Sequence, residues 1–341
     1  MTLPTNPALS TVVIGAGQAG FEVCARLRDL GMTGAITLIG SEQHPPYQRP
    51  PLSKAYLLGK MELARLFFRP QSFYDEMDIA LKLGCDCVDI DRTAKQIVLN
   101  DGTRLPYDRL VLATGASPIQ LPAAVGGTLG RVYCMRSLTD ADALAARFKP
   151  DQHALIIGGG YIGLEAAAVA AGLGMKVTLV EASPRILQRV AANETASYFR
   201  DLHSSNGVDI REGVTVTRLI GDTDITGAEL SDGSVLDVDV VVTGIGVRPN
   251  TALAQAAGLE LENGIKVDER CITSDPAILA EGDCASFPYA GARIRLESVG
   301  NAIDQARSAA GTIAGAKRQY SAKPWFWSDQ YDVKLQIVGL S

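Results

Sequence analysis

Two short glycine turns carry the clearest chemistry in the sequence. Each has the pattern G-x-G-x-x-G, follows an apolar run and precedes an alanine-rich stretch. In such a turn the first glycine allows a tight bend, the second lets the backbone approach a pyrophosphate, and the third lets helix and strand pack closely. The N-terminus of the following helix faces the anion. The turn residues are Gly15, Gly17, Ala19 and Gly20 in the first copy and Gly158, Gly160, Ile162 and Gly163 in the second.

The segments around the two turns predict the elements that position them. In each copy a buried strand precedes the turn, a helix follows it and a second strand comes next, which is a βαβ unit. One such turn alone is a weak signal, whereas two in the same context predict two dinucleotide sites, and therefore electron transfer between the two cofactors. The expected elements are 11–14, 21–30 and 36–39 in the first copy, and 154–157, 164–173 and 176–181 in the second.

An acidic residue after each second strand indicates how the two sites differ. Glu181 ends the second repeat, where a carboxylate accepts hydrogen bonds from the ribose hydroxyls of adenosine and repels a 2′-phosphate. This position favours NADH over NADPH, although Arg185 lies only four residues further on. In the first repeat Ser41 and Glu42 share the corresponding place, and either can hold a ribose.

Three further strand ends are candidates for cofactor contacts, because ligands of α/β sheets lie at the carboxyl ends of the strands. The segment 107–115 ends in Thr114 and Gly115, and the segment 243–250 contains a similar exit. The segment 278–285 carries an acid at its end. The additional candidates are Gly244, Gly246 and Asp283.

Composition limits the class of protein. The 341 residues carry a net charge of −6, which argues against a nucleic-acid partner. Six cysteines form no C-x-x-C pair and only three histidines accompany them, so we expect no structural metal site. The N-terminus has no signal-peptide pattern, and glycines and charges interrupt the most apolar span, 154–180. These features predict a cytoplasmic protein with no membrane partner.

Four stretches of the sequence are distinctive: YQRPPLSKAYL (47–57), GGGYIGLEAA (158–167), LESVGNAIDQA (296–306) and PWFWSDQY (324–331). They resemble one branch of the two-dinucleotide flavoprotein reductases, the NADH-dependent ferredoxin reductases. The resemblance implies an α/β fold of the glutathione reductase type with two Rossmann-like domains and bound FAD and NADH. It places the FAD-binding domain at 1–115 and 245–320, split by an NADH-binding domain at 116–244. Residues 321–341 would begin a C-terminal α+β domain that is truncated here.

The resemblance also implies FAD contacts outside the first glycine turn. Ser41 stands where some members carry Asp, which leaves the ribose contact open and makes Glu42 the substitute. Asp283 would hold the ribityl chain, and the backbone of Val299 would meet the flavin edge. The remaining matched positions are Arg49, Lys54, Cys87, Arg136 and Trp327.

Lys54 and Glu165 are the expected catalytic residues. A lysine near the flavin N5 supplies positive charge where negative charge develops on hydride arrival. Glu165, two residues after Gly163, would pair with Lys54 and face the nicotinamide carboxamide. The alternative is an exposed loop lysine and a first-turn acid that complements the helix dipole.

The cysteines and the charge distribution indicate where the electrons go. No cysteine lies within 41–60, and Cys134 is alone in its segment, which argues against a disulfide reductase. Electrons are then expected to leave singly, to a [2Fe-2S] ferredoxin that feeds a cytochrome monooxygenase or a ring-hydroxylating dioxygenase. Residues 41–70 carry five Lys or Arg against two acids, and such a basic face would attract an acidic partner. The alternatives are a rubredoxin reductase, another NADH-oxidising flavoprotein, or an NADH-sensing flavoprotein resembling apoptosis-inducing factors.

Overall fold

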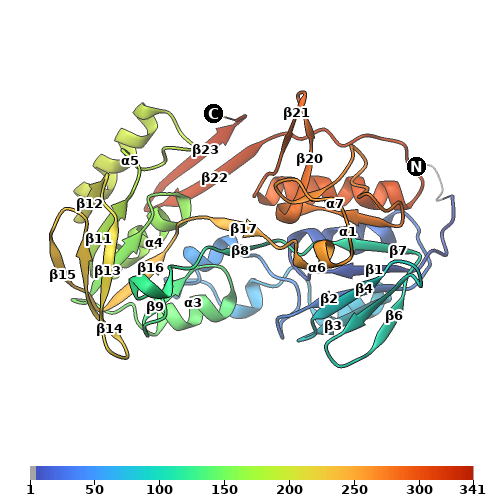
Figure 1. The fold of residues 1–341 in the computed structure, drawn as a ribbon, viewed down its shortest axis with the longest axis horizontal. Coiled ribbons are helices and arrows are strands. Elements are labelled where there is room, and N and C mark those ends of the chain that lie inside the picture. Colours follow the sequence, from blue (N-terminus) through green and yellow to red (C-terminus); the bar gives the residue numbers. More distant parts are fainter. Residues whose placement is uncertain (1–4, 341) are drawn as a thin grey trace. The chain divides into compact units, whose positions relative to one another are not determined.

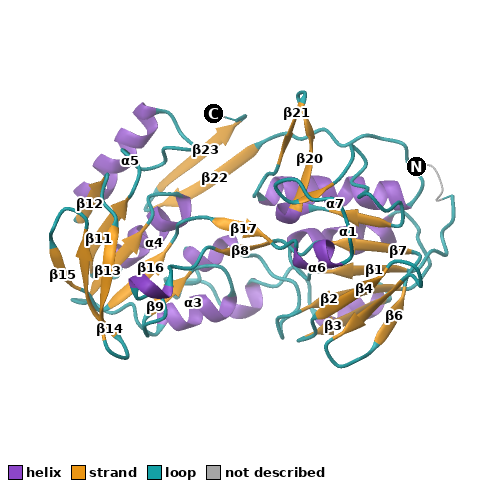
Figure 2. Ribbon diagram, in the orientation of Figure 1, coloured by secondary structure: helices purple, strands orange, loops and turns teal. Residues whose placement is uncertain are grey.

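The computed structural model describes residues 5–340, which form two compact units (Figure 1). The first unit comprises 5–48, 67–117 and 249–325, and the second comprises 49–66, 118–248 and 326–340. The loop 49–66 is thus grouped with the second unit, although the sequence placed it in the first domain. Helices and strands alternate along much of the chain (Figure 2), as expected of an α/β fold.

A parallel sheet of five strands forms the centre of the first unit. Its order is β19-β7-β1-β2-β3, and every neighbouring pair is parallel. All four residues of β1 are buried, as expected for a strand covered on both faces. The strands are β1 (Thr11–Ile14), β2 (Ile36–Gly40), β3 (Ile79–Leu83), β7 (Arg109–Leu112) and β19 (Ile278–Ala280).

Helices and small sheets complete the first unit. One hydrophobic core joins β1 to α1 and α7 through side chains such as Val13, Leu27 and Ala309. The hydroxyl of Ser298 accepts a hydrogen bond from the N–H of Asn301 and caps α7. The helices are α1 (Gln18–Asp29), α2 (Gln71–Glu76), α6 (Ala252–Ala256), α7 (Val299–Ile313) and the 3-10 turn η4 (Gly282–Cys284). Two further sheets are β4 (Cys87–Asp91), β5 (Gln96–Leu99) and β6 (Arg104–Pro106), and β18 (Ile265–Lys266), β20 (Ala285–Tyr289) and β21 (Ala292–Ile294).

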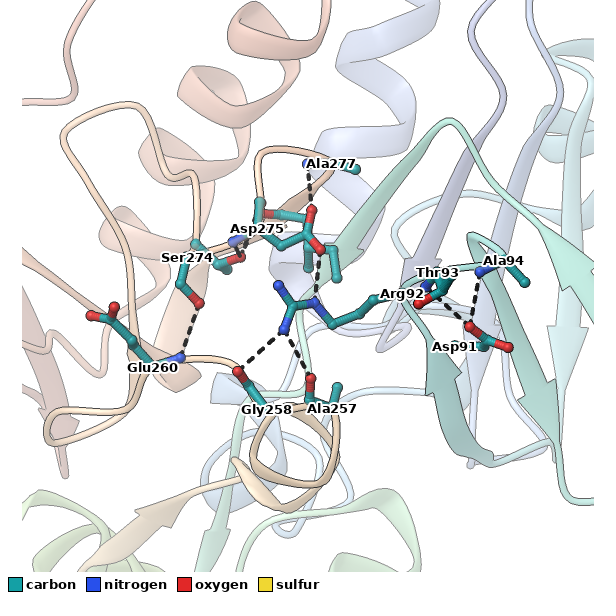
Figure 3. Close-up of polar contacts among 12 residues, drawn as sticks. Asp91, Arg92, Thr93, Ala94, Ala257, Gly258, Glu260, Ser274, Asp275 and Ala277 are labelled. Atoms are coloured by element: carbon teal, nitrogen blue, oxygen red, sulfur yellow. Dashed lines mark hydrogen bonds and ion pairs between the residues drawn. The ribbon is translucent and has the colours of Figure 1, made fainter.

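Arg92 ties three separate segments of the first unit together (Figure 3). Its Nε lies 2.8 Å from Asp275 Oδ2, and its Nη1 donates to the carbonyls of Ala257 and Gly258 just after α6. Burial pushes the pKa of Asp275 upward, but the Arg92 guanidinium and the Ala277 N–H hold it below its ordinary value. The carboxylate therefore stays charged and anchors the guanidinium.

The second unit has a parallel sheet of the same design. Its order is β12-β11-β10-β16-β9, again with every pair parallel. Helix α3 begins with a reciprocal cap in which Ser137 and Asp140 bind each other's backbone N–H. The elements are β9 (Val132–Cys134), β10 (His153–Ile157), β11 (Lys176–Glu181), β12 (Val208–Glu212) and β16 (Val240–Thr243), with helices α3 (Leu138–Ala145), α4 (Tyr161–Gly172) and α5 (Asn193–Ser205).

Smaller elements lie around this sheet. A small antiparallel sheet shares a hydrophobic core with it, to which residues such as Leu219 and Ala228 contribute. The chain crosses between the units along two paired strands, β8 (Ala116–Pro118) and β17 (Val247–Pro249). Among the described residues no helix is long and apolar enough to span a bilayer. The remaining elements are β13 (Val216–Gly221), β14 (Ile225–Leu230), β15 (Val235–Asp237), β22 (Trp325–Gln330) and β23 (Val333–Val338), with 3-10 turns η1 (Pro50–Ser53), η2 (Leu63–Arg65) and η3 (Ala123–Val125).

Candidate functional site

The two glycine turns have the same backbone geometry. Gly15 has φ of 115° and Gly158 has φ of 107°, a region that favours glycine. A Cβ on Gly20 would stand 1.9 Å from the Gly15 carbonyl oxygen, and one on Gly163 would stand 1.9 Å from that of Gly158. Both third glycines are therefore required for the helix to pack closely on its own turn.

The middle glycine of each turn faces open space instead. A Cβ on Gly17 or on Gly160 would meet no atom within 4 Å. These residues precede α1 and α4, and neither helix start has a side-chain cap. Each turn thus leaves room beside uncapped backbone N–H groups, as a dinucleotide pyrophosphate requires. Both sites fit the cofactors that the sequence predicts, with Ala19 buried on α1 and Ile162 exposed on α4.

The acids after the second strands are held differently in the two units. Glu181, the last residue of β11, accepts hydrogen bonds from the N–H of Gly159 at 2.6 Å and of Ser183 at 2.7 Å. This carboxylate therefore braces the glycine turn directly. In the first unit Ser41 follows β2, and Glu42 accepts a 2.6 Å hydrogen bond from the Tyr47 hydroxyl.

Further predicted residues of the first unit also lie at the ends of strands. The hydroxyl of Thr114, after β7, donates to the Asn250 carbonyl at 2.7 Å, and the Asn250 side chain donates back to the Thr114 carbonyl at 2.8 Å. Asp283 lies in η4, just after β19, and Val299 opens α7. The others are Gly115, with φ of 67°, and Cys87, the first residue of β4.

Lys54 and Glu165 lie together in the second unit. Lys54 Nζ is 2.6 Å from Glu165 Oε2, and the Ser53 hydroxyl donates to the same oxygen at 2.6 Å. Ser328 donates to the other oxygen, Oε1, at 2.7 Å. The glutamate is 2% exposed and the lysine side chain 17%. The predicted pair therefore exists as a buried ion pair, which makes the alternative of a solvated loop lysine wrong.

The remaining predicted positions of the second unit lie near its strand ends, in the 49–66 loop or within β22. Arg49 Nη1 donates to the Arg136 carbonyl at 2.7 Å, so these two candidates are neighbours. Trp327 lies on β22, one residue before Ser328. Gly244 follows β16, and its carbonyl oxygen is 2.5 Å from where a Gly158 Cβ would stand. Gly246 accepts a 3.0 Å hydrogen bond from the Ile119 N–H.

Sequence reasoning missed several buried polar residues. Ser53 and Ser328 bind Glu165, and both lie within motifs that were singled out for other members. Gln330 in turn contacts Ser328, and His203 contacts Gln330. Glu281, two residues before Asp283, is fully buried, and neither carboxylate oxygen has a hydrogen-bond partner among the described residues. Burial, and secondarily the charge of Glu22, raise the pKa of Glu281 well above its ordinary value.

The cysteines do not form a redox pair in the described part of the chain. All six are free thiols, and four of them are buried. Burial raises the pKa of Cys87 to about 11, which disfavours a reactive thiolate. Within residues 5–340 no group of His, Cys, Asp and Glu side chains is arranged to hold a metal ion.

Comparisons with known proteins show the family of this chain. The family of pyridine nucleotide-disulphide oxidoreductases matches residues 9–306, and a reductase C-terminal family matches 325–341. Putidaredoxin reductase CamA of Pseudomonas putida is 43% identical over 97% of this chain and 80% of its own length. A ferredoxin–NAD(P)(+) reductase of Sphingomonas sp is 44% identical over 99% of this chain and 82% of its own. The crystal structure of the covalent putidaredoxin reductase–putidaredoxin complex has a TM-score of 0.95 at 43% identity, covering 98% of this chain and 82% of that one.

The fold and the site define an oxidoreductase with two dinucleotide-binding folds. The chain belongs to the family of pyridine nucleotide-disulphide oxidoreductases, in which it is similar to the ferredoxin reductases. The predicted fold class, the cofactors FAD and NAD(H), and the resemblance to ferredoxin reductases are thereby confirmed.

Proposed function

We propose that this protein passes a hydride from NADH to FAD and then single electrons to a [2Fe-2S] ferredoxin that supplies an oxygenase. In this assignment the first unit holds FAD, through its glycine turn, the Thr114–Gly115 exit, Asp283 and Val299. The second unit holds NADH through the turn at 158–163. The observation that carries the proposal is the pair of identical turns, each with an open middle glycine, together with the buried Lys54–Glu165 pair.

The chain's own residues would bind the two cofactors, orient them and stabilise the charge that develops during hydride transfer. Backbone N–H groups at the starts of α1 and α4 bind the two pyrophosphates. Glu181 accepts from ribose hydroxyls and selects against a 2′-phosphate. Bound FAD supplies the chemistry, since it accepts two electrons as hydride and releases them one at a time. Glu165 holds the Lys54 ammonium in a fixed place, where it stabilises the negative charge that arrives with the hydride.

A ferredoxin partner is supported by the relatives, whose names pair them with putidaredoxin and with ferredoxin. The basic segment 41–70 suits an acidic electron acceptor, because opposite charges speed encounter and orient the partner. Such a partner and a supply of NADH support a cytoplasmic location for the protein. A rubredoxin would bind the same surface, so the two acceptors are tested side by side.

Two matched substitutions test the cofactor assignment. Gly17→Ala and Gly160→Ala both put a methyl group into open space, so neither creates a clash within the protein. We expect Gly17→Ala to weaken FAD binding and Gly160→Ala to weaken NADH binding, each by at least tenfold in Kd. Gly172→Ala is the control, because its Cβ also meets nothing within 4 Å but lies at the end of α4, away from both turns.

The measurements are FAD content after reconstitution, NADH binding by titration, and NADH-dependent reduction of a purified [2Fe-2S] ferredoxin and of a rubredoxin. A folded protein that takes up no FAD contradicts the proposal. The proposal is also contradicted if Gly17→Ala weakens NADH binding and Gly160→Ala weakens FAD binding, or if the protein reduces the rubredoxin but not the ferredoxin.

A further inference from the structure

A chain of buried hydrogen bonds leads away from the Lys54–Glu165 pair. Ser328 Oγ lies 2.7 Å from Glu165 Oε1, and Gln330 Nε2 lies 3.0 Å from Ser328 Oγ. His203 Nε2 lies 2.8 Å from Gln330 Oε1, and the Tyr331 hydroxyl lies 3.3 Å from His203 Nδ1. The chain therefore links β22 and α5 to the carboxylate that binds the lysine. We call Ser328, Gln330 and His203 the relay.

The relay is sealed from solvent. Ser328, Gln330 and His203 are each 0% exposed, and Glu165 is 2% exposed. An unpaired polar group at such a place is costly, since water cannot replace the lost partner. Breaking one link should therefore be felt along the whole chain instead of being repaired locally.

The charge on Glu165 fixes the direction of every link. An ionised carboxylate only accepts, so Ser328 must donate its single proton to Oε1. The Ser328 oxygen then accepts from the Gln330 amide N–H, which leaves the Gln330 carbonyl to accept from His203. His203 must accordingly carry its proton on Nε2 and offer Nδ1 to the Tyr331 hydroxyl. All donors point toward Glu165, an arrangement in which each bond polarises the next.

We propose that Ser328, Gln330 and His203 are positioning residues that hold the Glu165 carboxylate in a fixed orientation, and so set the place of the Lys54 ammonium. This inference rests on the proposed role of Lys54 in hydride transfer. It makes β22 part of the flavin-reducing machinery, although the relay itself touches neither Lys54 nor a reacting atom. Burial also lowers the pKa of His203, which keeps the ring neutral as the relay requires.

A second buried histidine of the same unit provides an internal reference. His153 Nδ1 lies 2.6 Å from the Asp237 carbonyl, which only accepts, while Nε2 lies 3.0 Å from the Thr178 hydroxyl. His153 must therefore carry its proton on Nδ1. The structure predicts opposite tautomers for the two buried histidines.

The first test reads these tautomers in the intact wild-type protein with FAD added. Two-bond ¹H–¹⁵N correlation spectra of histidine-labelled protein distinguish the protonated ring nitrogen, and His203→Phe and His153→Phe assign the signals. We expect Nε2–H at His203 and Nδ1–H at His153, both neutral at pH 7. A proton on Nδ1 of His203, or a charged ring, overturns the relay, and this result is read in the wild-type protein.

The second test asks whether the relay acts through Ser328. Ser328→Ala should slow flavin reduction by NADH about tenfold in stopped flow, as expected for losing a hydrogen bond to a charged group, with the half-saturating NADH concentration unchanged. Ser328→Thr, which keeps the hydroxyl, should restore most of the rate. His203→Phe should slow reduction less, and adding it to Ser328→Ala should slow reduction no further. His153→Phe is the matched control and should leave the rate unchanged.

The outcomes separate the two proposals. Additive effects of His203→Phe and Ser328→Ala, or equal slowing by His153→Phe, refute the relay and indicate general destabilisation. If Lys54→Met leaves flavin reduction unchanged, the proposed catalytic role of the pair fails instead, whatever the tautomers are. A wild-type rate in Ser328→Ala beside a slow Lys54→Met refutes the relay alone.

Discussion

The two compact units carry the same glycine turn, yet they treat a buried glutamate in opposite ways. In the second unit Glu165 is 2% exposed and receives contacts from Lys54, Ser53 and Ser328. In the first unit Glu281 is 0% exposed, and neither of its oxygens finds a partner among the described residues. The shared turn is proposed to bind a dinucleotide in both units, so the difference concerns what each unit does with charge.

The difference shows which of the two buried glutamates has partners that compensate a negative charge. A buried carboxylate stays ionised only when opposite charge and hydrogen bonds replace water, as they do around Glu165. Without such partners the group keeps its proton, and burial raises the pKa of Glu281 accordingly. The second unit therefore holds a charged pair in place, whereas the first unit buries, beside η4, an acid whose pKa is raised by burial.

Removing the partner of Glu165 should have the largest effect. Lys54→Met leaves the carboxylate buried without its counter-charge, which typically costs about 3–5 kcal/mol of stability. It also removes the positive charge proposed to stabilise arriving hydride, so flavin reduction should slow by up to about 10²–10³-fold, and the flavin reduction potential should fall. Urea unfolding and stopped-flow reduction by NADH measure the two effects.

The double variant Lys54→Met with Glu165→Gln provides the control. It no longer contains an uncompensated charge, so it should recover a large part of the lost stability and some of the lost rate. Equal unfolding free energies for the single and double variants would mean that Glu165 needs no counter-charge, which would erase its contrast with Glu281.

Glu181 is an intermediate case that sharpens the comparison, because its carboxylate has two backbone N–H donors but forms no ion pair within the described part of the chain. Glu181→Ala should weaken NADH use by about 1.5–3 kcal/mol in kcat/KM, since a charged hydrogen-bond acceptor is lost. The discrimination against NADPH should narrow, because the charge that repels the 2′-phosphate is gone. Steady-state kinetics with both nucleotides measure this change.

Glu181→Gln separates the loss of the hydrogen-bond acceptor from the loss of the negative charge. The amide keeps an acceptor for the turn but removes the charge, so it should recover part of the NADH activity while still tolerating NADPH. A wild type that prefers NADPH, or variants with unchanged preference, would show that Glu181 does not select the nucleotide.

The sequence predicted the fold and the turns well because both depend on local rules. Glycines at fixed spacing between two strands and a helix admit few other structures, and each turn has the expected φ and close approach. The Lys54–Glu165 pair was reached through the family resemblance and then found at 2.6 Å.

What the sequence could not predict depends on contacts between distant segments. Ser328 reaches Glu165 from 163 residues away, and His203 meets Gln330 across 127. No periodicity in the sequence predicts such pairs. Glu281 was missed for a different reason: a charged residue is almost never fully buried without a partner, whereas the fold encloses this one completely.

The smallest expected effect concerns Glu281 and appears as a pH dependence. The raised pKa means that the folded state keeps this proton above the ordinary value of 4.5, where the unfolded chain releases it. Unfolding then releases a proton, so this group lowers the free energy of unfolding by up to about 1.4 kcal/mol per pH unit as pH rises from 4.5 toward the folded pKa. The contribution is fully present below pH 4.5 and is lost at higher pH.

Glu281→Gln isolates that contribution, because the amide has nearly the same shape and stays neutral at every pH. The two buried histidines have pKa values lowered by burial, so they add stability as pH rises toward 6.5, but they do so equally in wild type and variant. Urea unfolding at pH 5, 6, 7 and 8 should therefore give a stability difference that grows with pH in favour of the variant. A constant difference would mean that Glu281 titrates normally, and hence that a partner compensates its charge as fully as Lys54 compensates that of Glu165.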